Sequence, residues 1–414
     1  MKRNIFQICL FLVISFSVNA QQNNKYQDAG SSVQYQYITT YDLAKLNKIL
    51  NAELNEFLNG SSMPFEDFKG KFTAPKYPVK LYRVKYNSVV PELNNQPTLA
   101  SGLVAIPETG KDSMPIVSYQ HGTVFGKTEV PSFPDESMET KLMIAVFASQ
   151  GYIVTGADYF GLGISTMPNS YLVKESSEQA CLDMLFAAKN VLTANKIKQG
   201  PLFVHGWSQG GWTNMTFLRK LESLNIPVTA AGTASAPVDG AVIVNRWMNN
   251  YQPIDAVWLP ACATNFIFAK DQYNFPGLAA RAIRPEYYQA AKDFYEFKID
   301  WPTYYSKTKG KIYEVLNPEF MATGNIANDP FWKLLENMQA YRWRCKTPLV
   351  NYYGESDEVI PPYIAKLAEG FHQVLGGGSN TKAVSAGAKA DHRATYIYSL
   401  IHVKPWFDSY LIGK

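Results

Sequence analysis

Short apolar runs alternate with amphipathic helical segments along most of the chain. The apolar runs have the length of buried strands and lie at residues 79–84, 103–106, 115–119, 152–156, 202–204, 228–233, 348–354 and 382–385. The helical segments lie at residues 141–149, 176–192, 212–221 and 362–375, and a last helix is expected near the C-terminus. Strands and helices that alternate in this way predict an α/β fold, with a mostly parallel central sheet covered by helices on both faces.

Two stretches interrupt this alternation. Residues 21–75 are polar, with leucines at helical spacing from Leu43 onward, and we expect an N-terminal helical extension. Residues 240–340 contain helical segments but no clear strand, and 19 of about 100 positions are aromatic, against 14% for the whole chain. This pattern predicts an inserted helical cap, or lid, between two parts of one core at 76–239 and 341–414. The aromatic rings either form the core of the cap or line an acyl or aryl pocket.

The first 20 residues have the pattern of a signal peptide. Lys2 and Arg3 precede an apolar run that ends at Val18, and the small residue Ala20 marks the expected cleavage site. The run is too short for a comfortable membrane span, and no later stretch approaches the required length, so we expect no integral membrane span. The sequence therefore predicts a protein exported to the periplasm or the extracellular space.

Charge and cysteine content narrow the function further. Removal of Lys2 and Arg3 lowers the formal net charge from +4 to +2, which argues against nucleic acid as a partner. Cys181, Cys262 and Cys345 remain after processing; Cys262 and Cys345 flank the predicted cap, so the sequence leaves open a disulfide between them. No cysteine or histidine spacing resembles a metal site.

The most informative segment is the pattern Gly206-x-Ser208-x-Gly210. It follows the apolar run 202–204 and precedes the helical segment 212–221, which is the strand–turn–helix context of a nucleophile elbow. In that turn the serine adopts a strained backbone conformation, and glycines are needed because a Cβ would collide with the neighbouring strand or helix. The alternative is a chance match in a glycine-rich loop. The context favours Ser208 as a catalytic nucleophile.

A serine nucleophile needs a histidine base and an acid that orients it, and after such an elbow the chain order is Ser, acid, His. Of the five histidines, His392 alone lies on a loop between a short strand and the final helix, where a base is expected. Asp357 follows the strand that ends at Gly354, and it is favoured as the acid over Glu355 and Glu358. Asp391 is adjacent to His392 in sequence. It is not expected to be the acid, because adjacent side chains usually point apart.

Two backbone amides are expected to bind the oxyanion that forms during acyl transfer. One belongs to Gln209, directly after the nucleophile. The other lies in the loop His121-Gly122-Thr123-Val124, where Gly122 permits a tight backbone and Thr123 is the favoured donor.

With these residues in place, the chain from about residue 78 onward resembles the α/β-hydrolase superfamily. The segment 158–163, the elbow around Ser208 and the helical cap before Asp357 resemble the secretory lipases and their bacterial relatives. The resemblance implies a Ser–Asp–His esterase or lipase with a lid and without a cofactor. It does not identify the ester, because members of this superfamily differ widely in substrate.

The sequence thus predicts an exported carboxylic ester hydrolase that acts on a small-molecule or lipid ester through an acyl-enzyme. Two alternatives stay open. One is a serine peptidase of the same fold, which would need acidic residues from the cap to bind the terminal amine of a peptide; the candidates are Glu286, Asp293, Glu296 and Asp300. The other is a non-catalytic binding module on a hydrolase scaffold.

Overall fold

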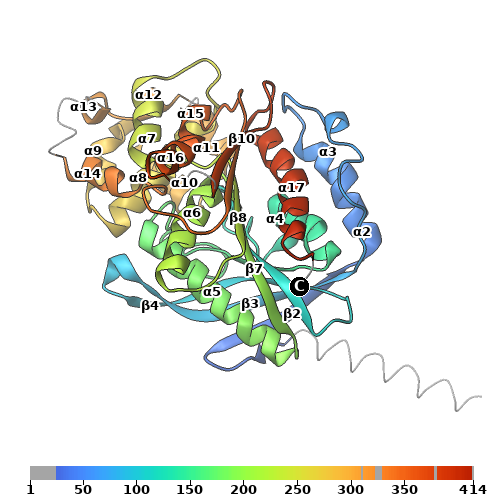
Figure 1. The fold of residues 1–414 in the computed structure, drawn as a ribbon. Coiled ribbons are helices and arrows are strands. Elements are labelled where there is room, and N and C mark those ends of the chain that lie inside the picture. The colour runs from blue at the N-terminus through green and yellow to red at the C-terminus, as the bar shows by residue number, and fades with distance from the viewer. Residues whose placement is uncertain (1–24, 309–310, 322–328, 377–379, 413–414) are drawn as a thin grey trace, which may run out of the picture.

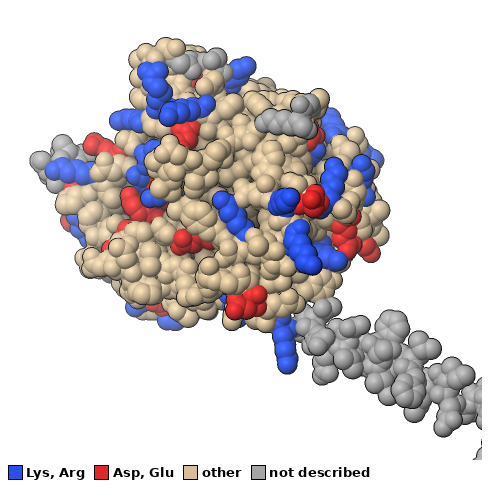
Figure 2. All heavy atoms as spheres, turned by 60° about the horizontal axis from the view of Figure 1, so that its bottom comes forward, with Lys and Arg blue, Asp and Glu red and all other residues tan. Residues whose placement is uncertain are grey.

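The computed structural model describes residues 25–308, 311–321, 329–376 and 380–412. The predicted signal peptide, residues 1–20, lies outside these residues. Within them, no helix is long and apolar enough to cross a membrane. Lys and Arg side chains are interspersed with Asp and Glu over the face drawn in Figure 2, where broad uncharged areas separate them.

Ten strands form one sheet in the order β1-β2-β3-β4-β6-β5-β7-β8-β9-β10 (Figure 1). The six strands from β6 to β10 in this order run parallel, and the first four run antiparallel. The bounds are β1 Gln27–Asp28, β2 Val33–Tyr41, β3 Val79–Val90, β4 Gln96–Pro107, β5 Ser113–Gln120, β6 Ile153–Ala157, β7 Lys198–Trp207, β8 Ala230–Ala234, β9 Leu349–Tyr353 and β10 Thr381–Ser385. The predicted mostly parallel sheet is confirmed.

Helices cover both faces of the sheet, as predicted. Helices α5 (Lys174–Ala194) and α6 (Gln209–Ser223) lie on one face, and α4 (Met138–Val146) and α17 (His392–Ser409) lie on the other (Figure 1). An apolar cluster is buried on each face of the sheet. Because side chains alternate along a strand, the strands contribute to both clusters: in β3, Val84 belongs to the cluster with α5, and Leu81 belongs to the cluster with α17. Two shorter helices, α15 (Pro362–Ala365) and α16 (Leu367–Val374), precede β10.

The N-terminal segment is more than a helical extension. It contains α2 (Leu43–Lys48), a π-helical turn (Ile49–Glu53) and α3 (Leu54–Phe57), but also the nine-residue strand β2. Strand β2 pairs antiparallel with β3 and extends the sheet. The sequence interpretation missed it because the alternating partners of its apolar residues are Gln and Thr, which give the segment a polar composition.

Helices are the regular secondary structure of residues 240–340 where the structure describes them. Their helices are α7 Gly240–Asn249, α8 Leu259–Tyr273, α9 Leu278–Ala282, α10 Pro285–Tyr295, α11 Trp301–Thr308, α12 Ile312–Val315, α13 Pro318–Met321 and α14 Pro330–Asn337. They gather on one side of the molecule (Figure 1). In the described part of this region, the only strand-like pairing is an isolated bridge between Ile283 and Leu316. The inserted helical cap is therefore present.

Cys181, Cys262 and Cys345 are buried free thiols. Cys262 lies on α8, and the Cys345 thiol lies 3.3 Å from the carbonyl oxygen of Thr347. The disulfide that the sequence left open between Cys262 and Cys345 is absent, so noncovalent contacts hold the cap on the core.

Strand β7 and helix α6 approach each other at glycines. A Cβ on Gly206 would lie 2.2 Å from the carbonyl oxygen of Gly210, and a Cβ on Gly210 would lie 1.9 Å from the carbonyl oxygen of Gln120. Real Cβ atoms do not approach backbone oxygens so closely. The glycines therefore allow the helix to start directly above the sheet, as the sequence predicted.

We expect Gly210→Ala to lower the free energy of unfolding by about 3 kcal/mol, because the methyl group forces α6 away from β5. Urea denaturation followed by circular dichroism measures this loss. The matched control is Gly370→Ala: it is an exposed position in helix α16, and its Cβ would meet open space. The control should be neutral or stabilising by up to about 1 kcal/mol. Equal stability of the two variants would contradict the proposed steric role of Gly210.

Candidate active site

Ser208 lies at the turn between β7 and α6. Its backbone has φ 57° and ψ −124°, a conformation that non-glycine residues rarely adopt. Its amide donates to the carbonyl oxygen of Ala234 at 2.9 Å, which ties the turn to the end of the neighbouring strand β8. The strained backbone sits at the N-terminus of α6, where free amides and the helix dipole favour negative charge. The position has the geometry of a nucleophile elbow.

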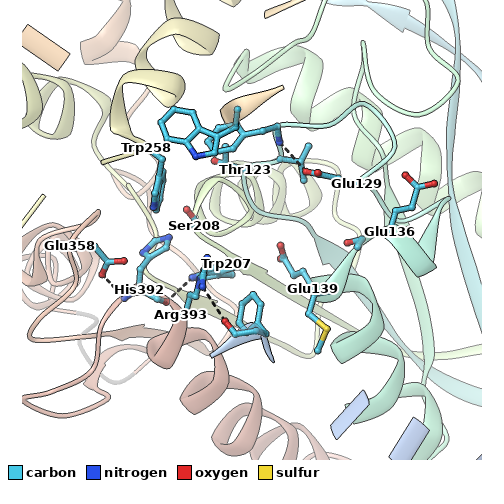
Figure 3. Close-up of a pocket in the computed structure, with 16 residues that line it drawn as sticks. Thr123, Glu129, Glu136, Glu139, Trp207, Ser208, Trp258, Glu358, His392 and Arg393 are labelled. Carbon is cyan, nitrogen blue, oxygen red and sulfur yellow. Dashed lines mark hydrogen bonds between the residues drawn. The ribbon is translucent and has the colours of Figure 1, made fainter. Parts of the chain in front are cut away.

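His392 and Asp357 form a buried pair. The Nδ1 atom of His392 lies 3.0 Å and 3.1 Å from the two carboxylate oxygens of Asp357. Asp357 also accepts hydrogen bonds from the amides of Val359 at 2.9 Å and Ile360 at 2.8 Å, and from the Ser235 hydroxyl at 2.6 Å. These bonds fix the carboxylate and leave Nε2 of the imidazole free to face the site. Figure 3 shows the His392 ring pointing toward Ser208.

The surroundings push the two pKa values apart. Burial lowers the pKa of His392, but attraction to Asp357 and their hydrogen bond outweigh it, so the pKa is raised above its ordinary value. Burial raises the pKa of Asp357, but His392, the Ile360 amide and the Ser235 hydroxyl outweigh it, so the pKa is lowered. The carboxylate is thus ionised and can stabilise an imidazolium.

The rejected alternatives to Asp357 occupy other places. Glu355 is exposed. Glu358 accepts a hydrogen bond from the backbone amide of His392 at 2.9 Å, and Asp391 caps α17 by accepting from the Ala394 amide at 2.8 Å. One detail of the sequence interpretation was wrong: His392 is the first residue of helix α17 rather than a loop residue. The capping aspartate directly before it carried that signal.

The other four histidines lie outside this pair. The ring of His121 contacts the carbonyl oxygens of Gly122 and Asp158, and burial lowers its pKa to about 4. His205 is buried in β7, His372 bonds to the Trp343 carbonyl oxygen, and the ring of His402 packs on Tyr398.

Gln209 and Thr123 are close to Ser208 at the same edge of the sheet. Gln209 is the first residue of α6, so its amide has no acceptor within the helix. Thr123 follows β5, and its hydroxyl lies 2.9 Å from that of Tyr171. Before it, the Gly122 amide donates to Glu139 at 2.8 Å. The sequence singled out the amides of Gln209 and Thr123. It gave no indication of Tyr171 or Glu139, which lie in other parts of the chain.

Ser208, His392 and Thr123 line one pocket of about 350 Å³ (Figure 3). Rings from the cap and the N-terminal segment and several acidic side chains complete its wall. The remaining lining residues are Phe57, Val124, Phe125, Glu129, Glu136, Ser137, Met138, Glu139, Trp207, Trp258, Trp301, Glu358 and Arg393. Trp258 and Trp301 belong to the aromatic-rich cap that the sequence indicated, although no single ring was singled out there. Among the acidic residues Glu358 was considered as an alternative acid, whereas Phe57, Glu129, Glu136 and Glu139 had no sequence signal. Within the described ranges, no group of three or more His, Cys, Asp or Glu residues could hold a metal ion.

Comparison with known proteins gives structural matches only. No protein-family profile and no curated protein sequence matches the chain. A proposed hydrolase from Legionella pneumophila matches with a TM-score of 0.79 and 21% identity, over 94% of this chain and 99% of that one. The rice cell wall degrading esterase LipA from Xanthomonas oryzae matches with a TM-score of 0.77 and 19% identity, over 94% and 99%.

Lipase A from Candida antarctica, in its closed state, matches with a TM-score of 0.62 and 14% identity, over 93% of this chain and 83% of that one. At these identities the likeness shows the fold alone, and it agrees with the mostly parallel sheet covered by helices described above. The chain therefore has the α/β-hydrolase fold and resembles the hydrolases, esterases and lipases that share it.

Proposed function

We propose that the protein hydrolyses carboxylic esters through an acyl-enzyme, with Ser208 as nucleophile, His392 as base and Asp357 as the acid that orients it. The observation that carries the proposal is that the strained Ser208 and the ring of His392, which is paired with the buried Asp357, line one pocket. The structural likeness to esterases supports the same class of reaction.

In the proposed mechanism, the Ser208 hydroxyl attacks the ester carbonyl carbon while Nε2 of His392 takes its proton. Asp357 accepts the Nδ1–H hydrogen bond, which holds the required tautomer and stabilises the imidazolium. The carbonyl oxygen becomes an oxyanion, which the amides of Gln209 and Thr123 bind. Collapse expels the alcohol, which takes the proton from His392. Water then attacks the acyl-enzyme with His392 again as base and releases the acid.

The peptidase alternative is less well supported. The cap carboxylates considered for binding a peptide amine are Glu286, Asp293, Glu296 and Asp300, and none of them lines the pocket. The similar solved structures described above are hydrolases, an esterase and a lipase.

Contacts between the cap and the core favour an esterase with a fixed cap over a lipase whose lid opens at an interface. Three side chains of α8 and α10 donate to backbone carbonyls of the segment 168–172. Lys270 donates to Leu172 at 2.8 Å, Tyr273 to Pro168 at 2.7 Å and Tyr295 to Asn169 at 2.7 Å. Opening of the cap would break all three bonds, each with a net contribution of about 0.5–1.5 kcal/mol. We therefore propose that dissolved esters enter the pocket with the cap in place.

We further propose that the enzyme works outside the cytoplasm, because residues 1–20 have the pattern of a signal peptide. The Xanthomonas esterase is described as degrading the rice cell wall. Aryl and plant-derived esters therefore belong among the substrates to be tested.

The central test is hydrolysis of p-nitrophenyl esters from acetate to palmitate and of methyl esters of plant phenolic acids, with aminoacyl p-nitroanilides alongside. We expect ester hydrolysis with a preference for short or aryl acyl groups. Ser208→Ala should reduce kcat by about 10⁶-fold and leave the circular dichroism spectrum unchanged. Retention of most activity by this variant would end the proposal, and anilide cleavage without ester cleavage would favour a peptidase.

The pH dependence tests the His392–Asp357 pair. The base must be neutral to accept the serine proton, so kcat/KM should fall as the pH drops through the pKa of His392. Because that pKa is raised, this acid limb should lie above about 6.5, the value for an unperturbed histidine. Asp357→Asn removes the attraction, so the His392 pKa should fall and kcat should decrease about 10⁴-fold. Histidine NMR titration of the variant measures the pKa directly, and an unchanged value would contradict the pairing.

The fixed cap is tested by the rate on p-nitrophenyl butyrate below and above its solubility limit. We expect simple saturation without a rise when the interface forms, because we propose that substrate enters with the cap in place. The double variant Tyr273→Phe, Tyr295→Phe should lower the free energy of unfolding by about 1–3 kcal/mol. Tyr363→Phe, at an exposed position of α15, is the matched control. A sharp rise in wild-type activity above the solubility limit would instead indicate a mobile lid.

A further inference from the structure

Glu139 is a buried carboxyl group in the pocket that the proposed mechanism does not use. It lies in the first turn of α4, just after the capping residue Ser137, and its side chain turns toward the pocket (Figure 3). The residue is only 8% exposed. Its Oε2 atom accepts the hydrogen bond from the Gly122 amide at 2.8 Å. This carboxyl group therefore binds the loop that follows β5, directly before the proposed oxyanion donor Thr123.

The loop is fixed at three successive residues, by one side chain from helix α4 and two from the connection between β6 and α5. The His121 carbonyl oxygen accepts a hydrogen bond from the Tyr159 hydroxyl at 3.1 Å. The Gly122 amide is bound by Glu139, and the Thr123 hydroxyl lies 2.9 Å from that of Tyr171. The contact at Gly122 holds the backbone itself. The Gly122 N–H and the His121 carbonyl oxygen belong to the same peptide group, so Glu139 and Tyr159 hold that group from its two sides. Because glycine has wide conformational freedom, loss of the Glu139 bond would let the His121–Gly122 peptide group turn and carry the Thr123 amide away from the site.

Gly122 is closely packed against Glu139 and Trp207. A Cβ at this position would lie 3.0 Å from Oε2 of Glu139 and 3.3 Å from both the ring and the carbonyl oxygen of Trp207. The loop therefore sits between helix α4 and the end of strand β7, in contact with both. Correct aim matters here because an amide stabilises an oxyanion only when it points to the place where the charge develops.

We infer that Glu139 is a positioning residue, which holds the His121–Gly122 peptide group in place and so fixes the point from which the next peptide group presents the Thr123 amide to the oxyanion. The inference rests on the proposed function, because it assigns a task within that reaction. It adds a residue that neither the serine, acid and base pattern nor the glycine-rich loop indicates.

The protonation state of Glu139 agrees with this task. Burial raises its pKa to about 8, against the opposing effects of the Gly122 amide and the Tyr119 hydroxyl. The nearest titratable groups on neighbouring elements are Tyr119, Tyr159 and Tyr396, whose pKa values are raised well above the ordinary value, mainly by burial. The other ionisable groups facing the same pocket are Glu129, Glu136, Glu358, His392 and Arg393. Below pH 8 the carboxyl group thus binds the amide without placing a negative charge near the oxyanion.

Two variants separate the hydrogen bond from the charge. Glu139→Gln keeps an acceptor for the Gly122 amide and cannot ionise; it should keep kcat near the wild-type value at pH 7 and lose any decline of kcat above pH 8. Glu139→Ala removes the acceptor and should lower kcat by about 10- to 100-fold with little change in KM, less than the loss of a whole oxyanion donor, about 10²- to 10³-fold. The matched control is Glu178→Gln, an equally buried glutamate on α5 away from the pocket, which should leave kcat and the pH profile unchanged.

Amide hydrogen exchange of residues 119–125 gives a readout independent of turnover. Exchange should quicken in Glu139→Ala and stay at the wild-type rate in Glu139→Gln. Unchanged exchange in Glu139→Ala, or faster exchange with unchanged kcat, would overturn the inference. If Glu139→Ala does not fold, an alkaline decline of kcat that persists in Glu139→Gln would overturn it. If the wild-type protein cleaves no ester, the proposed function fails, whereas the exchange data still decide whether Glu139 holds the loop.

Discussion

The structure depends on the close approach of strands β5 and β7 and helix α6 at Gly206 and Gly210. A Cβ at either glycine would lie within 2.2 Å of a backbone oxygen, so no other residue fits without moving the helix or the sheet. This contact sets where α6 begins, and the start of α6 forces the residue before it, Ser208, into its strained conformation. The strain is retained because the packing of a large core on both sides of the sheet overdetermines it.

The carboxyl edge of the parallel strands brings the remaining groups to that serine. Thr123 follows β5, Ser208 follows β7, Asp357 follows β9 and His392 follows β10. Each strand end is fixed by its neighbours, so residues far apart in sequence meet without a long loop having to hold them. The cap contributes aromatic rings to the pocket wall, and the hydrogen bonds of Lys270 and the two cap tyrosines keep it on the core.

The features predictable from sequence were those with a local pattern. The alternation of strands and helices, the turn at Ser208, the proposed acid after β9 and the proposed base near the start of the last helix all follow from patterns within short segments. Strand β2 was not predicted because the Gln and Thr residues between its apolar residues give the segment a polar composition. It forms a strand because it pairs with the edge of β3. Phe57 and Glu139 escaped for a different reason. Neither lies in a motif, and each reaches the pocket only because distant elements pack together.

Two buried carboxyl groups in this site illustrate how packing decides chemistry. Asp357 and Glu139 are both withdrawn from water, which by itself disfavours the charged form of each. Asp357 receives two backbone amides, a hydroxyl and the His392 ring, and these donors keep it ionised. Glu139 accepts from the Gly122 amide, and both this bond and Tyr119 lower its pKa. The effect of burial is larger, so the pKa of Glu139 rises to about 8. Asp357 thus holds a charge that can support an imidazolium, while the Glu139 carboxyl group beside the proposed oxyanion loop stays neutral below pH 8. The number of donors around each carboxyl group, rather than its depth, separates their roles.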